Sequence, residues 1–327
     1  MARILVTGGA GYIGAHICRA LAARGDLPIA FDNLSGGHAH AVQWGPLVHG
    51  DIRSAAELDK AFSEFGPQAV MHCAASIEIN EGQKHPFPFW ENNVGGAINL
   101  LGAMVRAGVK PIVFSSSCAV YGEPDTLPIR EGEPRTPVSV YGQTKLAVEM
   151  LLADLALSDE IHFAALRYFN AAGASPDAEI GEEHDPETHL IPNALRAAAG
   201  LDNARLKVFG ADYDTHDGTC LRDYIHVVDL AAAHLAALDR VMAGSSELCC
   251  NIGTGHGATV LEVLQAVERV TGSKVPYDIH PRRAGDAAVL LADTRLAQTE
   301  LGFAPTSSSI DQIISDAWRF HARKWDA

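Results

Sequence analysis

The stretch Ile4-Leu5-Val6-Thr7-Gly8-Gly9-Ala10-Gly11-Tyr12-Ile13-Gly14 decides the fold of this chain. A short apolar run enters a turn that contains three spaced glycines, and a helix-forming segment, His16–Ala23, follows at once. Glycines permit a tight turn and let the backbone approach a pyrophosphate. The N-terminus of the following helix presents free N–H groups and a partial positive charge to that group. The stretch therefore predicts a dinucleotide-binding strand–turn–helix unit in which Gly8, Gly11 and Gly14 contact the cofactor.

An acidic residue at the end of the second predicted strand indicates which dinucleotide binds. Asp32 follows Phe31, about 20 residues after the glycine turn, where a carboxylate accepts hydrogen bonds from the adenosine ribose and repels a 2′-phosphate. The residues at 33–37 include no arginine, so NAD is favoured over NADP. Farther along, Asp51 ends another predicted strand and is expected near the adenine amino group.

Short apolar runs alternate with helical segments through the first two-thirds of the chain, which is typical of βαβ units and a parallel sheet. We predict an α/β fold, a Rossmann-type doubly wound parallel sheet with a smaller mixed α/β substrate domain. The NAD-binding domain is expected over residues 1–175, rejoined by part of 218–245, and the substrate domain over 176–327. The acidic, Gly- and Pro-rich segment 171–188 is expected to be a long loop over a cleft, its acids solvated. The predicted strands are Ile4–Val6, Ile29–Phe31, Leu47–His49, Ala69–Cys73, Ile112–Ser115 and His162–Arg167; the predicted helices are His16–Ala23, Val94–Arg106, Asp229–Met242 and Thr259–Thr271.

Composition excludes several classes of partner. The 327 residues are 47% hydrophobic and 20% charged, and 25 Lys and Arg against 40 Asp and Glu leave a net charge of −15. Nucleic acids and anionic membranes demand a basic footprint, so we expect neither as a partner. The six cysteines form no C-x-x-C pair, and the histidines lack the spacing of a metal motif, so we expect free thiols and no metal. The chain contains no 18-residue apolar stretch and starts unlike a signal peptide, so we expect a cytoplasmic protein.

A tyrosine and a lysine four residues apart form the predicted chemical site. Tyr141 and Lys145 lie at i and i+4 of a predicted helix, on one face. Lowering a phenol pKa from about 10 to near 7 needs about 4 kcal/mol. One cation about 4 Å away supplies that order of energy, so Tyr141 is able to act as a general base. Ser117, at the end of a predicted strand upstream, offers a hydroxyl that shares a substrate oxygen with Tyr141.

Together these residues give the chain a resemblance to the extended short-chain dehydrogenase/reductase superfamily and, within it, to the UDP-glucose 4-epimerases. The similarity covers essentially the whole chain. Its blocks are TGGAGYIGAH at 7–16, FDNLS at 31–35, GDI at 50–52, ENNVGG at 91–96, FSSSCAVYGEP at 114–124, YGQTKLAVE at 141–149, LRYFNAAGA at 166–174, THLIP at 188–192, VFG at 208–210, RDYIHV at 222–227 and PRRAGD at 281–286.

The resemblance implies reversible 4-epimerisation of UDP-galactose and UDP-glucose by an isomerase that keeps NAD tightly bound. Hydride passes transiently from the sugar C4 to NAD, and a 4-keto sugar turns over in the pocket. Tyr141 then takes the 4-hydroxyl proton, Ser117 holds the 4-oxygen, and Lys145 binds the nicotinamide ribose and lowers the tyrosine pKa. Besides Tyr141, Lys145 and the glycines, the implied NAD contacts are Tyr12, Ile13, Asp32, Asn33, Asp51, Ile52, Ala74, Asn92 and Phe169. Besides Ser117 and Tyr141, the implied UDP-sugar contacts are Asn170, His189, Leu190, Val208, Phe209, Arg222, Arg283 and Asp286.

Three departures from related patterns bear on the activity. Ile77 stands where some members place a lysine next to the cofactor. Cys118 and Ala119 stand where the dehydratases place an Asp-Glu pair, which argues against loss of a sugar hydroxyl. Leu290 is intermediate between the bulky aromatic of members that refuse N-acetylated sugars and the small residue of permissive ones. The alternatives are therefore a 4-epimerase of UDP-N-acetylhexosamines or UDP-pentoses, an NAD-dependent nucleotide-sugar oxidoreductase that releases NADH, and a non-catalytic NAD-binding regulator.

Relatives dimerise through two long helices per subunit, and the resemblance therefore implies a homodimer. The apolar residues of the predicted tyrosine helix suit such a contact and equally suit packing on an internal sheet; they are Leu146, Met150, Leu151 and Leu155.

Overall fold

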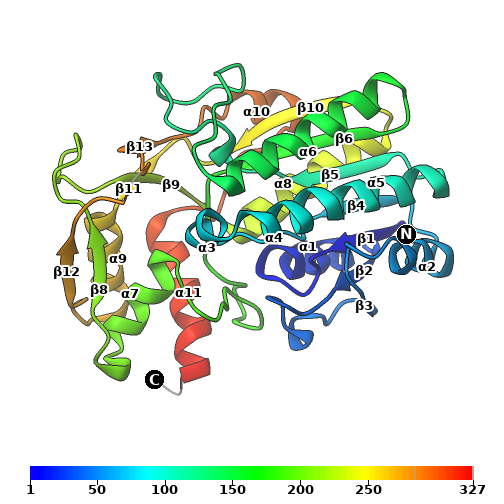
Figure 1. The fold of residues 1–327 in the computed structure, drawn as a ribbon. Helices are drawn as coiled ribbons and strands as arrows, with labels where there is room; N and C mark the ends of the chain where they lie inside the picture. Colours follow the sequence, from blue (N-terminus) through cyan, green and yellow to red (C-terminus); the bar gives the residue numbers. More distant parts are fainter. Residues whose placement is uncertain (284, 326–327) are drawn as a thin grey trace.

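A parallel sheet forms the centre of the larger lobe of the computed structural model, which describes residues 1–283 and 285–325. Within these residues the sheet has seven strands in the order β10-β6-β5-β4-β1-β2-β3, and every neighbouring pair runs parallel (Figure 1). The strands are β1 (Arg3–Thr7), β2 (Leu27–Asp32), β3 (Leu47–His49), β4 (Ala69–His72), β5 (Pro111–Ser115), β6 (His162–Tyr168) and β10 (Glu247–Ile252).

Helices cover both faces of this sheet because its strands are apolar on both sides. In β1, Ile4 and Val6 point into one core while Leu5 points into the other. The face covered by α2, α5 and α6 carries the Leu5 core, and α1, α8 and α10 cover the opposite face. These helices are α1 (Tyr12–Ala23), α2 (Ala55–Phe65), α5 (Gly96–Ala107), α6 (Val140–Leu157), α8 (Val227–Met242) and α10 (Arg295–Leu301).

The strand order reverses between β1 and β4, which are neighbours in the sheet although β2 and β3 separate them in sequence. In open parallel sheets a ligand binds at such a reversal, beside the carboxyl ends of the strands. Between β4 and β5 the chain crosses this edge in three short helical elements, which are α3 (Ile79–Lys84), α4 (Pro86–Trp90) and a π-helical turn (Glu91–Gly95).

A smaller lobe is built from the later part of the chain and packs around a core of its own. Short strands form two small sheets, ordered β11-β9-β13 with β7 on β9, and β12-β8. The strands are β7 (Asn170–Ala172), β8 (Leu206–Phe209), β9 (Leu221–His226), β11 (Gly257–Thr259), β12 (Tyr277–His280) and β13 (Val289–Leu290); the helices are α7 (Leu190–Ala198), α9 (Val260–Thr271) and α11 (Ile310–Trp325).

The chain returns from the smaller lobe to the large sheet. After β9, helix α8 packs against α1, and β10 then pairs with β6 over six residues. Helix α10 later contacts β10 and α8. The return therefore extends past residue 245, to which the sequence analysis assigned it.

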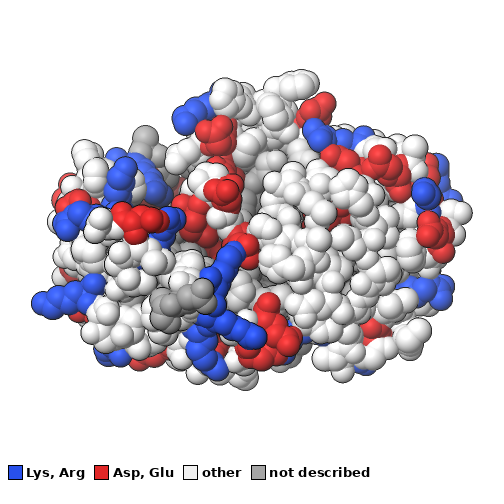
Figure 2. Space-filling view, turned by 90° about the horizontal axis from the view of Figure 1, so that it is seen from below, with Lys and Arg blue, Asp and Glu red and all other residues white. Residues whose placement is uncertain are grey.

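All six predicted strands of the parallel sheet are confirmed, with ends that shift by at most two residues. Helix α1 begins at Tyr12, four residues before the predicted start, so the last glycine of the turn already lies inside it. The six cysteines are free. None of the helices in the described ranges is long and apolar enough to cross a bilayer. Figure 2 shows basic and acidic side chains interspersed near the junction of the lobes, and a broad area with few charges over the larger lobe.

Candidate active site

The glycine turn packs so closely against neighbouring backbone that a side chain at Gly8 or Gly14 would collide with it. Gly8 adopts a φ of +71°, and a Cβ there would lie 2.7 Å from the backbone nitrogen of Ala74, which follows β4. A Cβ on Gly14 would lie 2.0 Å from the carbonyl oxygen of Gly8. Gly11 begins α1 without a side-chain cap, so no side chain occupies the space in front of the first helical N–H groups. The predicted residues Gly8, Gly11, Gly14 and Ala74 thus come together at the reversal of the sheet.

Tyr12 and Ile13 occupy the first turn of α1. The Tyr12 hydroxyl donates a hydrogen bond of 2.7 Å to the carbonyl oxygen of Gly173, which lies just past β7. This bond ties the start of the glycine-turn helix to the segment that leads into the smaller lobe. Ile13 is half-buried and packs against the core under α1.

Carboxylates end β2 and follow β3, as the sequence predicts. Asp32 is 8% exposed and accepts backbone hydrogen bonds from Ala10 and Leu34, at 3.0 and 2.8 Å. It therefore braces the glycine turn from the neighbouring strand. The Asp51 carboxylate accepts a 2.9 Å hydrogen bond from the Asn33 amide, and the Arg53 guanidinium holds its pKa well below the usual range. Ile52, next in sequence, is buried under α5.

The segment after β4 is pinned to the tyrosine helix by a chain of amides and hydroxyls. Asn93 donates to the Ser76 carbonyl and to the Thr144 hydroxyl, both at 3.0 Å. Thr144 in turn donates to the carbonyl oxygen of Tyr141 at 2.8 Å. The predicted Asn92 donates to the Ser76 hydroxyl at 3.2 Å, and Ile77 is 40% exposed. The π-helical turn supplies both asparagines, and such turns are frequent at functional sites.

Ser117, Tyr141 and Lys145 meet at the carboxyl edge of the sheet. Ser117 follows β5, and its hydroxyl accepts the N–H of Ala119 at 3.2 Å, which caps the short 3₁₀ turn that begins there. Tyr141 and Lys145 lie on the first turns of α6 and are 8% and 3% exposed. The ammonium of Lys145 donates a 2.7 Å hydrogen bond to the carbonyl of Ser115 and lies 5.6 Å from the centre of the Tyr141 ring.

Burial shifts the pKa values of both Tyr141 and Lys145. Burial raises the pKa of the Tyr141 phenol, and the neighbouring Ser117 hydroxyl opposes that rise. Burial also lowers the pKa of Lys145 to about 8. In the protein without cofactor the lysine donates to a backbone carbonyl, and burial is the largest cause of both pKa shifts. That Lys145 lowers the pKa of Tyr141 when NAD is bound stays a prediction.

A buried ionic network adjoins the group formed by Ser117, Tyr141 and Lys145. Arg167 on β6 donates two hydrogen bonds to the carboxylate of Glu149 on α6, at 2.9 and 2.7 Å, and both side chains are at most 2% exposed. The same carboxylate accepts a 2.6 Å bond from the hydroxyl of Ser116. Arg167 also donates to the hydroxyl of Tyr121 at 2.8 Å. The end of β5 is thereby fixed to α6 one residue before Ser117.

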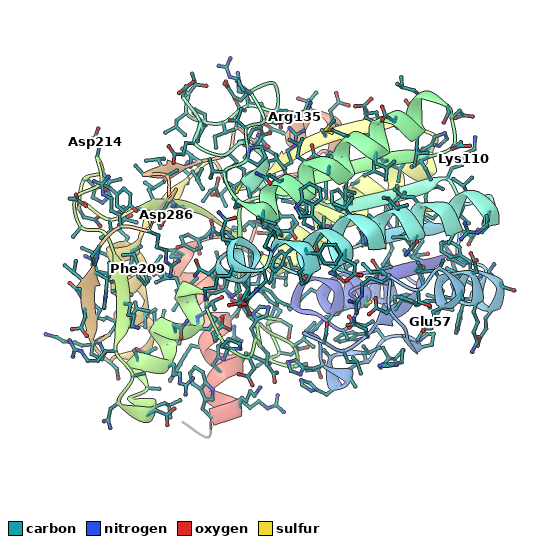
Figure 3. The ribbon with its side chains drawn as sticks, in the orientation of Figure 1. Glu57, Lys110, Arg135, Phe209, Asp214 and Asp286 are labelled. Carbon is teal, nitrogen blue, oxygen red and sulfur yellow. The ribbon has the colours of Figure 1, made fainter. Side chains whose placement is uncertain are left out.

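The proposed nucleotide end of the site lies on the smaller lobe, where Figure 3 labels Phe209 and Asp286. Arg222 on β9 is ion-paired with Asp286 and donates to the carbonyl of Ala287 at 2.8 Å. The guanidinium of Arg283 lies 4.0 Å above the Phe209 ring at the end of β8. The four predicted residues Phe209, Arg222, Arg283 and Asp286 therefore form one contiguous wall. Val208 faces the core beneath it, and Ala284 of the PRRAGD block lies outside the described residues.

Two further predicted contacts lie between this wall and Ser117. Phe169 follows β6 and packs in a small apolar cluster with Cys118, which follows Ser117, and with Leu290 on β13. Asn170 begins β7 and is in register with Tyr224 on β9. The residue that the sequence analysis associated with sugar choice, Leu290, is in register with Arg222.

The segment between β7 and α7 corrects the expectation of a solvated acidic loop. The structure buries Glu182, 5% exposed, and brings its carboxylate to 3.0 Å from Nδ1 of His189. Glu187 accepts a 2.9 Å bond from the same nitrogen. Burial raises the pKa of Glu182 to about 7, and the two carboxylates raise the pKa of His189 to about 9 against the effect of burial. His189 and Leu190, both predicted to bind substrate, lie at the start of α7.

Comparison with known proteins identifies the family. The model of the NAD dependent epimerase/dehydratase family matches residues 4–253. The chain belongs to this family. The UDP-glucose 4-epimerase of Rhizobium leguminosarum bv. trifolii is 47% identical over 320 residues, 98% of this chain and 97% of that protein.

Solved structures agree with the family assignment over the full length. The UDP-glucose 4-epimerase from Brucella ovis in complex with NAD has a TM-score of 0.95 and 48% identity and covers 98% of both chains. The enzyme from Stenotrophomonas maltophila, with bound NAD and formylated UDP-arabinopyranose, has a TM-score of 0.95, 42% identity and full coverage of both chains. The predicted Rossmann-type fold is therefore confirmed.

Two supporting groups of this epimerase/dehydratase family member escaped the sequence analysis. One is the pair Glu149 and Arg167, which was quoted within motifs but given no role. The available signal was Arg167 at the end of an otherwise apolar predicted strand, since a buried charge requires a partner of opposite sign. The other is His234 on α8, buried, whose ring lies 2.9 Å from the Ser115 hydroxyl. Nothing local in the sequence indicates that α8 passes behind β5.

Proposed function

We propose that the chain is an isomerase that interconverts UDP-galactose and UDP-glucose by reversible 4-epimerisation, using bound NAD and a 4-keto intermediate. One observation carries the proposal: Tyr141 and Lys145 are buried together with Ser117 at the carboxyl edge of the sheet. The glycine turn lies along the same edge, through contacts of Gly8 with Ala74 and of Cys73 with Ser115. Full-length relatives named UDP-glucose 4-epimerase support the same activity.

The residues present fit NAD. The glycine turn leaves room for a pyrophosphate where a Cβ on Gly8 or Gly14 would collide with backbone, and α1 presents its first N–H groups there. Asp32 ends β2 as an acceptor for ribose hydroxyls. The supporting contacts assigned to NAD are Tyr12, Ile13, Asn33, Asp51, Ile52, Ala74, Asn92 and Phe169. When bound, NAD supplies the acceptor, and later the donor, of the hydride at the sugar C4.

The chain's own residues manage the proton. Ser117 holds the sugar 4-oxygen beside the Tyr141 phenol, and Tyr141 removes the hydroxyl proton as the base and returns it as the acid. The buried position of Tyr141 excludes water from the exchange. Lys145, held by the Ser115 carbonyl, keeps a positive charge beside the phenol, and a further cationic group placed there lowers the pKa of Tyr141 toward neutrality.

The nucleotide binds at the wall on the smaller lobe. Arg222 and Arg283 are suited to the diphosphate and Asp286 to the ribose hydroxyls, since guanidinium groups match phosphate oxygens. Phe209, a half-exposed ring beneath Arg283, offers a flat apolar surface to the base. The remaining contacts assigned to the UDP-sugar are Asn170, His189, Leu190 and Val208.

Sugar choice and the competing reactions are decided near Ser117. Leu290 packs with the cluster beside this serine, so its size sets the space for a substituent on the sugar. UDP-N-acetylhexosamines and UDP-pentoses are the alternative substrates. Burial raises the pKa of the Cys118 thiol to about 12. A thiol in this environment is poorly suited to protonate a leaving hydroxyl, which argues against dehydration.

A direct assay tests the proposal. The purified protein is mixed with UDP-galactose, and chromatography is expected to show UDP-glucose approaching equilibrium without added cofactor. Stoichiometric release of NADH would instead identify an oxidoreductase, and binding of NAD without turnover of any UDP-sugar would identify a regulator. Comparing kcat/KM for UDP-glucose, UDP-N-acetylglucosamine and a UDP-pentose separates the alternative substrates.

The same proposal includes an assembly, a division of the chain and a location. Exposed apolar side chains on α5 and α6 support a homodimer through these helices; they are Ile98, Val105, Met150 and Leu157. Of the residues first considered, Leu151 and Leu155 pack on the sheet instead. Residues 1–175 with α8 and β10 would form the NAD-binding unit, and the rest of 176–327 the UDP-sugar unit. Six free thiols support a reducing compartment, the cytoplasm. Light scattering of the wild type and of Met150→Asp tests the dimer.

A further inference from the structure

Four metal-ligating side chains outside the proposed catalytic centre converge between β7 and α7. Glu182, His184, Glu187 and His189 each present one ligand atom, and these four atoms all lie within 4.8 Å of one another. Each residue comes from a segment of eight residues that leads directly into α7. None of them belongs to the catalytic group at the end of β5.

The distances inside this cluster match those between ligands that share one small cation. Nδ1 of His184 lies 3.7 Å from Glu182 and 3.6 Å from Glu187, and Nδ1 of His189 lies 3.0 and 2.9 Å from the same two carboxylates. Ligand bonds of about 2.0–2.2 Å in a tetrahedral zinc site place neighbouring ligand atoms about 3.4 Å apart. The four histidine–carboxylate separations, from 2.9 to 3.7 Å, bracket that value.

Two of these groups lack adequate partners in the protein. Nδ1 of His184 is fully buried and has no hydrogen-bond partner among the described residues, because both carboxylates lie too far away. The Glu182 side chain is 6% exposed, and the nitrogen that lies 3.0 Å from it, Nδ1 of His189, also bonds to Glu187 at 2.9 Å. Buried polar groups are normally paired, so an orphaned nitrogen facing two carboxylates points to a missing ligand.

The negative charge of the two carboxylates also favours a bound cation. Two carboxylates taken out of water side by side repel each other and require positive charge nearby. A metal-ligating nitrogen carries no proton, so zinc displaces the proton that His189 shares with Glu187. With both imidazoles neutral the four side chains then carry two negative charges, which a dication balances. Imidazole and carboxylate together favour Zn²⁺ among the common divalent ions, since Mg²⁺ and Ca²⁺ prefer oxygen alone.

We propose that Glu182, His184, Glu187 and His189 form a structural zinc site. The ion ties the segment 182–189 together just before α7, where Glu187 also accepts hydrogen bonds from the N–H groups of Thr188 and His189, both at 2.8 Å. All four tetrahedral positions are filled by the protein, as in sites that stabilise a fold and do not activate water. The zinc therefore takes no part in proton transfer.

Metal content tests the site independently of activity. The full-length protein is loaded with Zn²⁺, passed over a desalting column and analysed by plasma mass spectrometry. We expect about one zinc per chain in the wild type and less than a tenth as much in His184→Ala and Glu187→Gln. His40→Ala is the matched control: His40 is an exposed histidine on the adjoining loop whose ring contacts Glu183, outside the cluster. This variant is expected to retain the zinc.

A second measurement keeps the proposal testable if a cluster variant fails to fold. Crystals of the wild type soaked in Zn²⁺ are expected to show an anomalous peak between the four ligand atoms. The melting temperature of the wild type should rise with added Zn²⁺, and that of folded His184→Ala should not. Retention of less than a tenth of a zinc per chain with an unchanged melting temperature, or an anomalous peak at His38 and His40 alone, would overturn the assignment.

Discussion

Replacing Tyr141 by Phe separates the proposed chemistry from the fold. The substitution removes one hydroxyl, whose neighbour in the structure is Ser117, and leaves the buried ring in place. General acid–base catalysis typically contributes about 10²–10⁴-fold, so we expect kcat for UDP-galactose to fall by that factor, or about 3–5 kcal/mol of barrier. One neutral hydrogen bond contributes about 1 kcal/mol, so the free energy of unfolding should change little. Lys145 bonds to the Ser115 carbonyl, so NAD should remain bound.

Tyr121→Phe is the matched control for this prediction. Tyr121 is also buried, but its hydroxyl donates to Asn251 at 2.7 Å and accepts from Arg167 at 2.8 Å. Losing it leaves an amide and a guanidinium short of a partner, at about 1–3 kcal/mol of unfolding free energy, while turnover should change far less than in Tyr141→Phe. Coupled epimerase assays and urea unfolding measure both quantities. A Tyr141→Phe protein that keeps more than a tenth of the wild-type kcat would refute the assignment of the base.

Three other substitutions probe the surroundings of the base. Lys145→Met should raise the unfolding free energy of the NAD-free protein at pH 7 by up to about 3 kcal/mol. Loss of the hydrogen bond to Ser115 reduces this gain by about 1 kcal/mol. The physical reason is that burial lowers the lysine pKa from 10.5 to about 8. The stability gained by the variant should shrink as pH rises from 8 toward 10.5, because in that range the folded wild type has lost the lysine charge while its unfolded chain still carries it. A difference in unfolding free energy that stays constant across that range would contradict this. Glu149→Gln and Arg167→Met should each lower the unfolding free energy in urea by about 3–5 kcal/mol, because each single change leaves a buried charge without its partner. The double variant should lose much less than the sum of the two single losses. Strictly additive losses would contradict a direct interaction between the two side chains. The third test compares kcat/KM for UDP-N-acetylglucosamine with kcat/KM for UDP-glucose. Leu290→Gly should raise this ratio about tenfold, and Leu290→Tyr should lower it about tenfold. The same ratio in both variants and the wild type would place Leu290 outside the sugar pocket.

The sequence predicted the sheet well because its signals are local. Each strand of the parallel sheet is a short apolar run between turn residues, and the glycine turn leaves little choice of geometry around Gly8 and Gly14. The i, i+4 spacing likewise places Tyr141 and Lys145 on one face of α6, which the structure confirms.

Long-range pairing was the part that the sequence could not supply. The acidic segment was expected to be solvated, yet Glu182 is buried, and its charge acts on the buried Tyr12 of α1, which lies 170 residues earlier in the chain. The effect of Lys145 on Tyr141 likewise depends on a distant element. Its strength depends on where the ammonium points, and the Ser115 carbonyl that captures it lies on another element.

Strand β10 completes the large sheet from a position late in the chain. It pairs with β6 about 80 residues after that strand has been made, so a ribosome releases β6 long before its partner exists. Until then the backbone groups of β6 form an exposed edge that invites pairing with another chain. We infer that the lobes cannot mature in sequence order. A nascent or truncated chain that stops short of residue 252 should be recognised by chaperones and should aggregate, although it contains every residue of the glycine turn and of the proposed catalytic group.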